Sequence, residues 1–158
     1  MKICVVGVGY VGLVTAGCLA EAGNNIVCVD NDADKIEMLR NGEIPIYEPG
    51  LTEIVRHNQK LGRLEFTTEL QDGVDNSLVI FIAVGTPSAP DGSADISAVL
   101  EVAERIGQSL REYRIVATKS TVPVGTHLKV SEVIKSQTEV PFDYVSNPEV
   151  LKEGAAGE

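Results

Sequence analysis

Residues 2–12 read KICVVGVGYVG, a β-branched apolar run that leads directly into three glycines spaced as GxGxxG. A strand before this motif and a helix after it are the context that a phosphate-binding turn requires. Gly7 allows the tight turn, Gly9 lets a pyrophosphate approach the backbone, and Gly12 lets the helix pack closely on the strand. Free backbone N–H groups and the positive end of the helix dipole then attract phosphate without any lysine.

The same region has the length of a signal peptide or a membrane span, because residues 3–20 carry no charge. Its pattern argues against both, since four glycines interrupt it and the run at residues 3–6 is β-branched rather than leucine-rich. A buried parallel strand is apolar on both faces and shows no alternation. We therefore expect a buried strand and a buried helix here, and no membrane role.

A second apolar run ends in Asp30, eighteen residues after Gly12. A carboxylate at this position accepts hydrogen bonds from the adenosine ribose hydroxyls and repels a 2′-phosphate. Lys35, one turn into the next helix, either reaches the adenosine side or is a solvated charge on the helix face. The glycines alone would also suit a plain turn, but the strand, the spacing and Asp30 together predict NAD binding in preference to NADP.

Short apolar runs alternate with segments of helical periodicity along the whole chain. This alternation predicts an α/β fold, a Rossmann-type doubly wound parallel sheet of six strands in a single domain. The expected strands are 2–6, 26–30, 64–67, 78–84, 115–118 and 142–146. The expected helices are 11–22, 33–40, 50–60, 95–110 and 126–135, with a weaker turn at 69–74, loops at 43–49 and 85–94, and the start of a further helix at 151–154.

Composition excludes several classes of function. Thirteen Lys and Arg against twenty-three Asp and Glu give a net charge of −10, which repels nucleic acid and anionic membranes. Three cysteines cannot all pair, so a reducing, cytoplasmic setting fits best. His57 and His127 have no Cys, Asp or Glu partner at metal-ligand spacing, and no metal site is expected.

Polar residues follow the fourth and fifth predicted strands. Ligands of doubly wound sheets lie beyond the carboxyl ends of the strands, near the point where the strand order reverses. The fourth strand leads into Gly85, which allows backbone approach, and Thr86, which offers a hydroxyl. The fifth leads into KSTVPVGT (119–126), which includes Thr121 and faces the expected nicotinamide half. Each of these residues also suits ordinary turn and capping chemistry.

The sixth strand leads into NPEVLKEG (147–154). Glu149 and Glu153 are four residues apart, so on a helix they would share one face. Two carboxylates beside a cofactor suit acid–base work. At a helix start they are also favoured by the dipole alone, and composition leaves both interpretations open.

Five segments together resemble the N-terminal domain of the UDP-glucose/GDP-mannose 6-dehydrogenases. They occur in order over the whole chain, and they are GVGYVGL (7–13), PIYEPGL (45–51), GTP (85–87), KSTVPVGT (119–126) and NPEVLKEG (147–154). The stretches DGSAD (91–95) and EGAA (153–156) are more similar to the UDP-glucose branch than to the GDP-mannose branch.

The resemblance implies oxidation of a sugar C6 alcohol to a carboxylate by two hydride transfers to NAD, as from UDP-glucose to UDP-glucuronate. Thr121 would position a water and Glu149 would assist hydrolysis of a thioester, so both are expected catalytic residues. The expected cofactor contacts are Gly7, Gly9, Tyr10, Val11, Gly12, Asp30, Lys35, Gly85, Thr86, Thr121 and Glu153. The expected substrate edge consists of Glu149, Val150, Leu151, Lys152 and Glu153. Full-length members of the family are usually homo-oligomers.

The chain departs from the family in one respect, because the family needs a cysteine nucleophile that comes from a later part of the full-length protein. Cys4, Cys18 and Cys28 fall in predicted strands and a helix, where cysteine behaves as a small buried apolar residue. We therefore expect residues 1–158 to be an NAD-binding domain without the central and C-terminal domains, which binds NAD without turnover. The alternatives are a GDP-mannose 6-dehydrogenase fragment, another Rossmann oxidoreductase, and a stand-alone NAD(H)-binding or sensing module.

Overall fold

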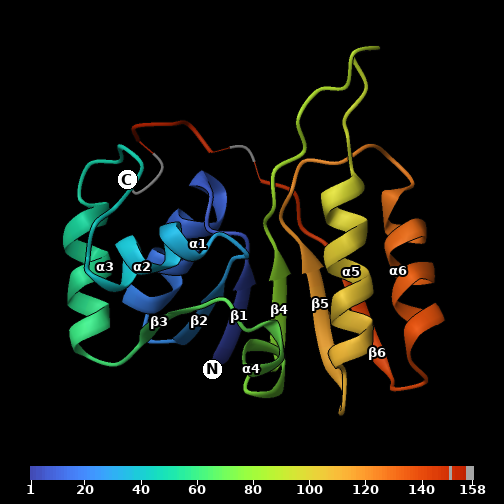
Figure 1. The fold of residues 1–158 in the computed structure, drawn as a ribbon, viewed down its shortest axis with the longest axis horizontal. Coiled ribbons are helices and arrows are strands. Elements are labelled where there is room, and N and C mark those ends of the chain that lie inside the picture. Colours follow the sequence, from blue (N-terminus) through green and yellow to red (C-terminus); the bar gives the residue numbers. More distant parts are fainter. Residues whose placement is uncertain (150, 156–158) are drawn as a thin grey trace.

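A computed structural model of the chain describes residues 1–149 and 151–155. Its six strands form one parallel sheet in the order β3-β2-β1-β4-β5-β6, which confirms the predicted doubly wound α/β fold (Figure 1). The strands are β1 (Lys2–Val6), β2 (Asn25–Val29), β3 (Leu64–Thr67), β4 (Val79–Ile82), β5 (Arg114–Thr118) and β6 (Phe142–Ser146). The helices are α1 (Tyr10–Glu21), α2 (Ala33–Arg40), α3 (Leu51–Lys60), α4 (Leu70–Asp75), α5 (Ser97–Ser109) and α6 (Thr126–Gln137).

Helices cover both faces of the sheet, so the protein has two hydrophobic cores. One core joins α1, α2 and α3 to β1, β2 and β3, and the other joins α4, α5 and α6 to β1, β4 and β5. Strand β1 contributes to both, with Ile3 and Val5 in the first core and Cys4 and Val6 in the second. This two-sided burial explains why the N-terminal run shows no alternation of apolar and polar residues.

The strand order reverses beside β1, and this reversal places the cleft. Strand β1 pairs with β2 on one side and with β4 on the other, and the last register pairs join Val6 to Val29 and to Ile82. The chain turns away immediately afterwards, at Gly7. Strands β2 and β4 therefore end one and two residues earlier than the predicted 30 and 84, because their neighbour β1 has already ended.

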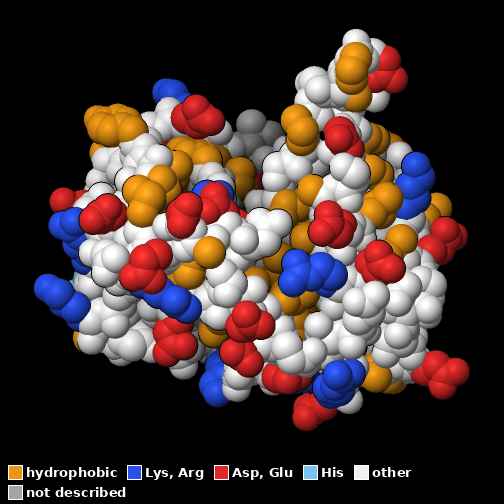
Figure 2. Space-filling view, viewed as in Figure 1, with side chains coloured by type: hydrophobic (Ala, Val, Ile, Leu, Met, Phe, Trp, Pro, Cys, Tyr) orange, Lys and Arg blue, Asp and Glu red, His pale blue; other side chains and the backbone are white. Residues whose placement is uncertain are grey.

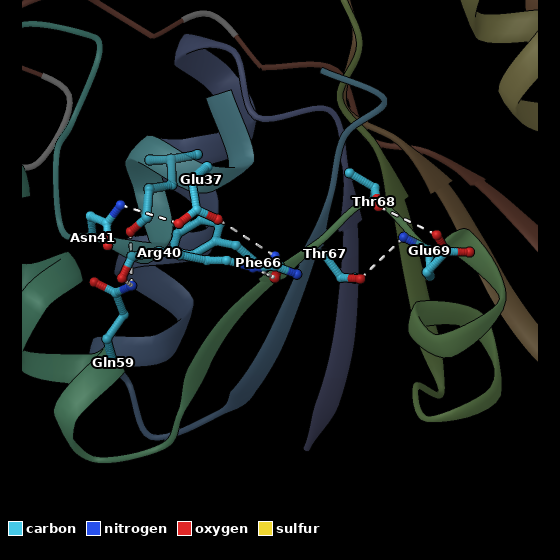
Figure 3. A network of polar contacts seen from close by, with 9 residues as sticks. Glu37, Arg40, Asn41, Gln59, Phe66, Thr67, Thr68 and Glu69 are labelled. Atoms are coloured by element: carbon cyan, nitrogen blue, oxygen red, sulfur yellow. Dashed lines mark hydrogen bonds and ion pairs between the residues drawn. The ribbon is translucent and has the colours of Figure 1, made fainter. Parts of the chain in front are cut away.

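Polar contacts fix the C-terminal end of α2 against α3 and β3 (Figure 3). The Arg40 Nε donates to the Phe66 carbonyl at 3.0 Å, and the Gln59 amide donates to the Leu39 carbonyl at 2.9 Å. Just after β3, the Glu69 N–H donates to the Thr67 hydroxyl at 3.1 Å. The end of β3 is thus held in place beside the cleft, where the Asp30 N–H donates to the Thr67 carbonyl at 3.2 Å.

The helix predicted to start at residues 151–154 is absent. Residues 147–149 and 151–152 have no regular structure, and residues 153–154 form a turn closed by a hydrogen bond from the Ala155 N–H to the Lys152 carbonyl at 3.1 Å. Position 150 lies outside the described residues. Glu149 and Glu153 therefore do not share a helix face. As Figure 1 shows, this segment crosses above the carboxyl edge of the sheet, from β6 toward α1 and α3.

Two further observations bear on the expectations from sequence. Cys18 is exposed on α1 rather than buried, whereas Cys4 and Cys28 are buried in β1 and β2. The helices in the part of the chain that the structure describes are all too short or too polar to span a membrane.

Candidate nucleotide-binding site

The turn between β1 and α1 contains three glycines. Two of them have no room for a side chain, and the third faces open space. Gly7 has a φ of +99°, and a Cβ on it would lie 2.8 Å from the Ala83 carbonyl oxygen. A Cβ on Gly12 would lie only 1.8 Å from the Gly7 carbonyl oxygen, so helix α1 packs directly on the turn. No atom lies within 4 Å of the position that a Cβ on Gly9 would take. The backbone at Gly9 is therefore open to a ligand.

A cavity of about 280 Å³ lies beside this turn, at the carboxyl ends of β1, β2 and β4. Gly7, Gly9, Asp30, Lys35 and Gly85 line it, so five predicted cofactor contacts are brought together. Leu70 and Val102 supply apolar wall from α4 and α5. The arrangement fits the adenosine end of a dinucleotide, with an apolar slot for a base and polar groups at its rim.

Asp30 is fixed between the phosphate-binding turn and the start of α2. Its Oδ2 accepts from the Val8 N–H at 2.9 Å, and its Oδ1 accepts from the Asp32 N–H at 3.0 Å. The Lys35 Nζ lies 3.6 Å from Oδ2. Each carboxylate oxygen has lone pairs to spare. Asp30 can therefore accept bonds from ribose hydroxyls while it holds the turn.

Sequence reasoning missed the part of this cavity that α4 and α5 supply. Thr68, Glu101 and Arg105 line its polar side in addition to the apolar wall. Thr68 had a detectable signal, because it directly follows β3 and the carboxyl ends of parallel strands form the ligand-binding edge. Glu101 and Arg105 lie on the surface of a regular amphipathic helix, and only the packing of α5 beside the turn brings them to the cavity.

The predicted residues of the nicotinamide side also come together, around the ends of β4 and β5. The Thr86 hydroxyl donates to the Thr121 carbonyl at 2.8 Å. The Thr121 hydroxyl donates to the Glu149 carbonyl at 3.5 Å. Thr121 is exposed to solvent, and Thr86 and Glu149 are partly exposed, as expected for groups at the edge of a cleft.

Lys119 is the residue at this edge whose role the sequence did not reveal. Its side chain is only 8% exposed, and its Nζ lies 2.5 Å from Glu149 Oε2 and 3.2 Å from Asn147 Oδ1. A buried ammonium group needs such partners to offset the loss of hydration. The contact fixes the Glu149 carboxylate over the end of β5.

The far end of the same segment lies against α1. Tyr10 donates its hydroxyl to Glu48 Oε2 at 2.5 Å, and the Gly154 N–H donates to the same oxygen at 2.8 Å. Burial and the hydrogen bond to Glu48 raise the pKa of Tyr10. Leu151 packs against the core formed with α1 and α3, whereas Lys152 and Glu153 are exposed. Val150, also predicted at the substrate edge, lies outside the described residues.

Acidic side chains outnumber basic ones in this protein, which carries a net charge of −10. In Figure 2, acidic and basic side chains are interspersed, and the molecule is hollowed between its two halves at the upper edge. Among the described residues, no group of three or more His, Cys, Asp or Glu side chains is placed to hold a metal ion. A dianion at this edge would meet the open backbone amides of the turn, with the basic side chains of Lys35 and Arg105 on the wall of the same cavity.

Comparisons with known proteins agree with this site. The NAD binding domain model of the UDP-glucose/GDP-mannose dehydrogenase family matches residues 1–158. The chain is 52% identical to a UDP-glucose 6-dehydrogenase of Pseudomonas aeruginosa, over 99% of the chain and 36% of that protein. It is 48% identical to the UDP-glucose 6-dehydrogenase TuaD of Bacillus subtilis, over 98% of the chain and 34% of that protein.

Solved structures give the same result. A UDP-glucose dehydrogenase from Pyrobaculum islandicum superposes with a TM-score of 0.95 at 40% identity, over 99% of this chain and 37% of that one. A GDP-mannose dehydrogenase from Pseudomonas aeruginosa superposes with a TM-score of 0.96 at 38% identity, over 99% of this chain and 38% of that one. The chain spans about a third of the length of the curated relatives it matches. It belongs to the UDP-glucose/GDP-mannose dehydrogenase family and corresponds to the NAD binding domain of that family.

Proposed function

We propose that this chain is the NAD-binding part of a nucleotide-sugar 6-dehydrogenase that converts UDP-glucose to UDP-glucuronate in two hydride transfers. One observation carries the proposal: the segment after β6 crosses the cleft and brings Glu149 beside Thr121, on the edge that the phosphate-binding turn also faces. Acid–base groups and a dinucleotide site therefore share one cleft, as a dehydrogenase requires. The names of the relatives favour UDP-glucose.

In this proposal the chain binds and orients NAD through groups that are already in place. The amides of the turn from Gly7 to Gly12 bind the pyrophosphate, with Tyr10 and Val11 at the first turn of α1. Asp30 accepts bonds from the adenosine ribose, and Lys35 stays close to the same sugar. NAD, when bound, supplies the hydride acceptor. The polar ends of β4 and β5, with Gly85, Thr86 and Thr121, flank its nicotinamide half.

In the same proposal, Thr121, Glu149 and the segment after them form the end of the cleft that binds the sugar. The Thr121 hydroxyl holds a water, and Glu149 accepts a proton from it, while Lys119 keeps the carboxylate in position. Lys152 and Glu153 present exposed side chains at the substrate edge. Leu151 packs into the core, so its backbone rather than its side chain is available to a substrate.

The cysteines of this chain do not suit the role of the nucleophile that the family chemistry needs. Burial raises the pKa of the Cys4 thiol to about 12 and that of Cys28 well above its ordinary value. The pKa of Cys18 is raised by partial burial and by the charge of Glu48. Reactive cysteines instead have lowered pKa values. We therefore propose that the isolated chain binds NAD and does not turn over.

Calorimetric titration of the purified 158-residue chain with NAD⁺ and NADP⁺ tests the cofactor part of the proposal. We expect NAD⁺ to bind and NADP⁺ to bind at least about tenfold more weakly, because Asp30 repels a 2′-phosphate. Equal affinity for the two cofactors, or no binding of NAD⁺, would contradict the proposal.

A second experiment tests the reaction. NADH formation is followed with UDP-glucose or GDP-mannose, first with the chain alone and then with the remaining part of a relative added in trans. We expect no turnover by the chain alone, and UDP-glucose oxidation when the complement is present. A preference for GDP-mannose would identify the other branch. Tight NAD(H) binding with no gain from any complement would identify a sensing module.

A further inference from the structure

The loop before α3 holds a buried carboxylate that the proposed function does not use. Glu48, in the stretch PIYEPGL, is only 7% exposed, whereas its neighbour Tyr47 is 85% exposed. Glutamate is rarely buried unless it is paired or hydrogen-bonded, because desolvation of the charge is costly. The buried position of Glu48 therefore depends on the partners that it meets.

Those partners come from two distant parts of the chain. Glu48 Oε2 accepts from the Tyr10 hydroxyl at 2.5 Å and from the Gly154 N–H at 2.8 Å. The Tyr10 hydroxyl also lies 3.3 Å from the Lys152 carbonyl, to which it can donate, and 3.2 Å from the Gly154 nitrogen. Gly154 has a φ of +84°, which a residue with a side chain rarely adopts. The turn at 152–155 thus presents its backbone to both side chains.

We propose that Glu48 is a positioning residue: with Tyr10 it forms a clamp that holds the turn at 152–155 against the start of α1. The Tyr10–Glu48 clamp is one of two anchors of the segment that crosses the cleft. The other is the contact of Lys119 with Glu149, on the β5 side.

The clamp connects the turn at 152–155 to the nucleotide site because Tyr10 belongs to both. Its backbone begins α1 directly after the open Gly9, and its side chain makes the clamp. Closing the clamp therefore pre-forms the rim of the pyrophosphate site and fixes the position of Glu153. This consequence for the cofactor rests on the proposed function, whereas the clamp itself rests on the contacts alone.

Hydrogen exchange of the purified chain tests the clamp without any ligand. In Tyr10→Phe we expect the Gly154 amide to exchange about tenfold faster, since the carboxylate loses its phenol partner and the turn loses one contact. Glu48→Ala should have an equal or larger effect, and Glu48→Gln, which keeps an acceptor oxygen in place, should restore most of the protection. Unchanged exchange at residues 152–155 in Tyr10→Phe would overturn the proposal.

Tyr113→Phe is the matched control, because the Tyr113 hydroxyl makes a comparable bond to Asp143 Oδ2 at 2.6 Å. Tyr113 directly precedes β5 and Asp143 lies in β6, so this bond is far from the turn at 152–155. It should leave exchange at Gly154 unchanged. Equal acceleration at Gly154 in Tyr113→Phe would show a general loosening and would also overturn the clamp.

NAD⁺ titration of the same variants separates the clamp from the proposed function. We expect Tyr10→Phe and Glu48→Ala to raise the Kd several-fold, Glu48→Gln to restore it, and Tyr113→Phe to leave it unchanged. An unchanged Kd in both clamp variants would overturn the role of the clamp at the nucleotide site. If the unaltered chain does not bind NAD⁺, the proposed function fails, and the exchange result still decides whether the clamp exists.

Discussion

The phosphate-binding turn and the segment after β6 face the same cleft but are held in different ways. The turn at residues 7–12 is held mainly by its backbone and its packing, because the Gly7 N–H donates to the Val29 carbonyl at 2.8 Å and Gly12 packs on Gly7. The Asp30 carboxylate adds one side-chain bond, to the Val8 N–H. The segment at 147–155 has one comparable backbone bond, from the Asn147 N–H to the Thr118 carbonyl at 3.0 Å, and is otherwise held by side chains, through Lys119 and through the Tyr10–Glu48 clamp.

This difference separates the rigid half of the site from the adjustable half. Displacement of the turn would disturb the sheet and α1, which carry the core. Displacement of the crossing segment would break a few side-chain contacts and leave the sheet in place, and a region held by few contacts opens at a low free-energy cost. We therefore expect the turn to behave as part of the fold and the crossing segment to respond to single side-chain changes.

The strongest test of this comparison is Gly12→Ala against Gly9→Ala. The new Cβ at position 12 would lie 1.8 Å from a backbone oxygen, and we expect a loss of about 3 kcal/mol of unfolding free energy from overpacking. At position 9 the new Cβ meets no atom within 4 Å, and the loss should stay within about 1 kcal/mol, which covers the poorer capping of α1 by alanine. Urea denaturation measures both variants.

The same pair also tests the nucleotide site. Gly9→Ala should weaken NAD⁺ binding although it leaves the fold intact, because the methyl group occupies the place proposed for the pyrophosphate. Similar stability of the two variants would show that the turn is less tightly packed than the comparison requires.

Asp30→Ala should have the next largest effect, and it should act mainly on the affinity for NAD⁺. Hydrogen bonds to a charged group contribute about 1.5 to 3 kcal/mol, so we expect a rise of about 30-fold in the Kd for NAD⁺. Stability should fall by about 1 kcal/mol, since the Val8 N–H loses its acceptor. Asp34→Ala removes an exposed carboxylate on α2 and serves as the control. Equal Kd values for the two variants would argue against Asp30 as the ribose-binding residue.

Lys119→Met tests the other half of the comparison, the claim that side chains hold the crossing segment. The change removes the partner of Glu149 and Asn147 but keeps an apolar side chain of similar length. Because Glu149 is 39% exposed, we expect a stability change within about 1 kcal/mol. The amides of Asn147 and Glu149, on either side of Pro148, should nevertheless exchange several-fold faster in NMR measurements. Lys129→Met, on the exposed face of α6, should leave them unchanged.

The last effect is negligible at neutral pH, appears only in alkali, and concerns the core beneath the turn. Burial raises the pKa of Cys4 from 9.0 to about 12, so the folded state keeps this thiol neutral where the unfolded state ionises it. Its contribution to stability is complete below pH 9 and is lost as the pH rises toward 12, by about 1.4 kcal/mol per pH unit. Cys4→Ala should therefore show a shallower loss of stability over this range than the unaltered chain. Parallel stability curves would contradict the assignment.

Much of the fold followed from local patterns. The apolar run, the GxGxxG turn and Asp30 predicted β1, α1 and a cleft beside the turn, because these features depend on neighbouring residues and on short connections. The ends of β4 and β5 were likewise predicted to meet, since parallel strands place their carboxyl ends at one edge. Thr86 and Thr121 lie there in hydrogen-bond contact.

The errors fall where distant residues decide the local structure. A helix was expected from Leu151, yet Leu151 packs against the core of α1 and α3, and the Gly154 N–H bonds to Glu48. A hydrogen bond from another part of the chain thus replaces the one a helix would supply. Cys18 was expected to be buried because cysteine usually behaves as a small apolar residue, but it lies on an exposed part of α1.

The sequence by itself determined the Rossmann-type sheet, the phosphate-binding turn and the carboxylate at the end of β2, because each depends on periodicity, glycine geometry or a fixed spacing. Only the tertiary structure decided which side chains hold the segment that crosses the cleft. Lys119 meets Glu149 across 30 residues of chain, and Glu48 meets Gly154 across 106. Contacts at such separations follow from the packing of whole elements, and no local pattern encodes them.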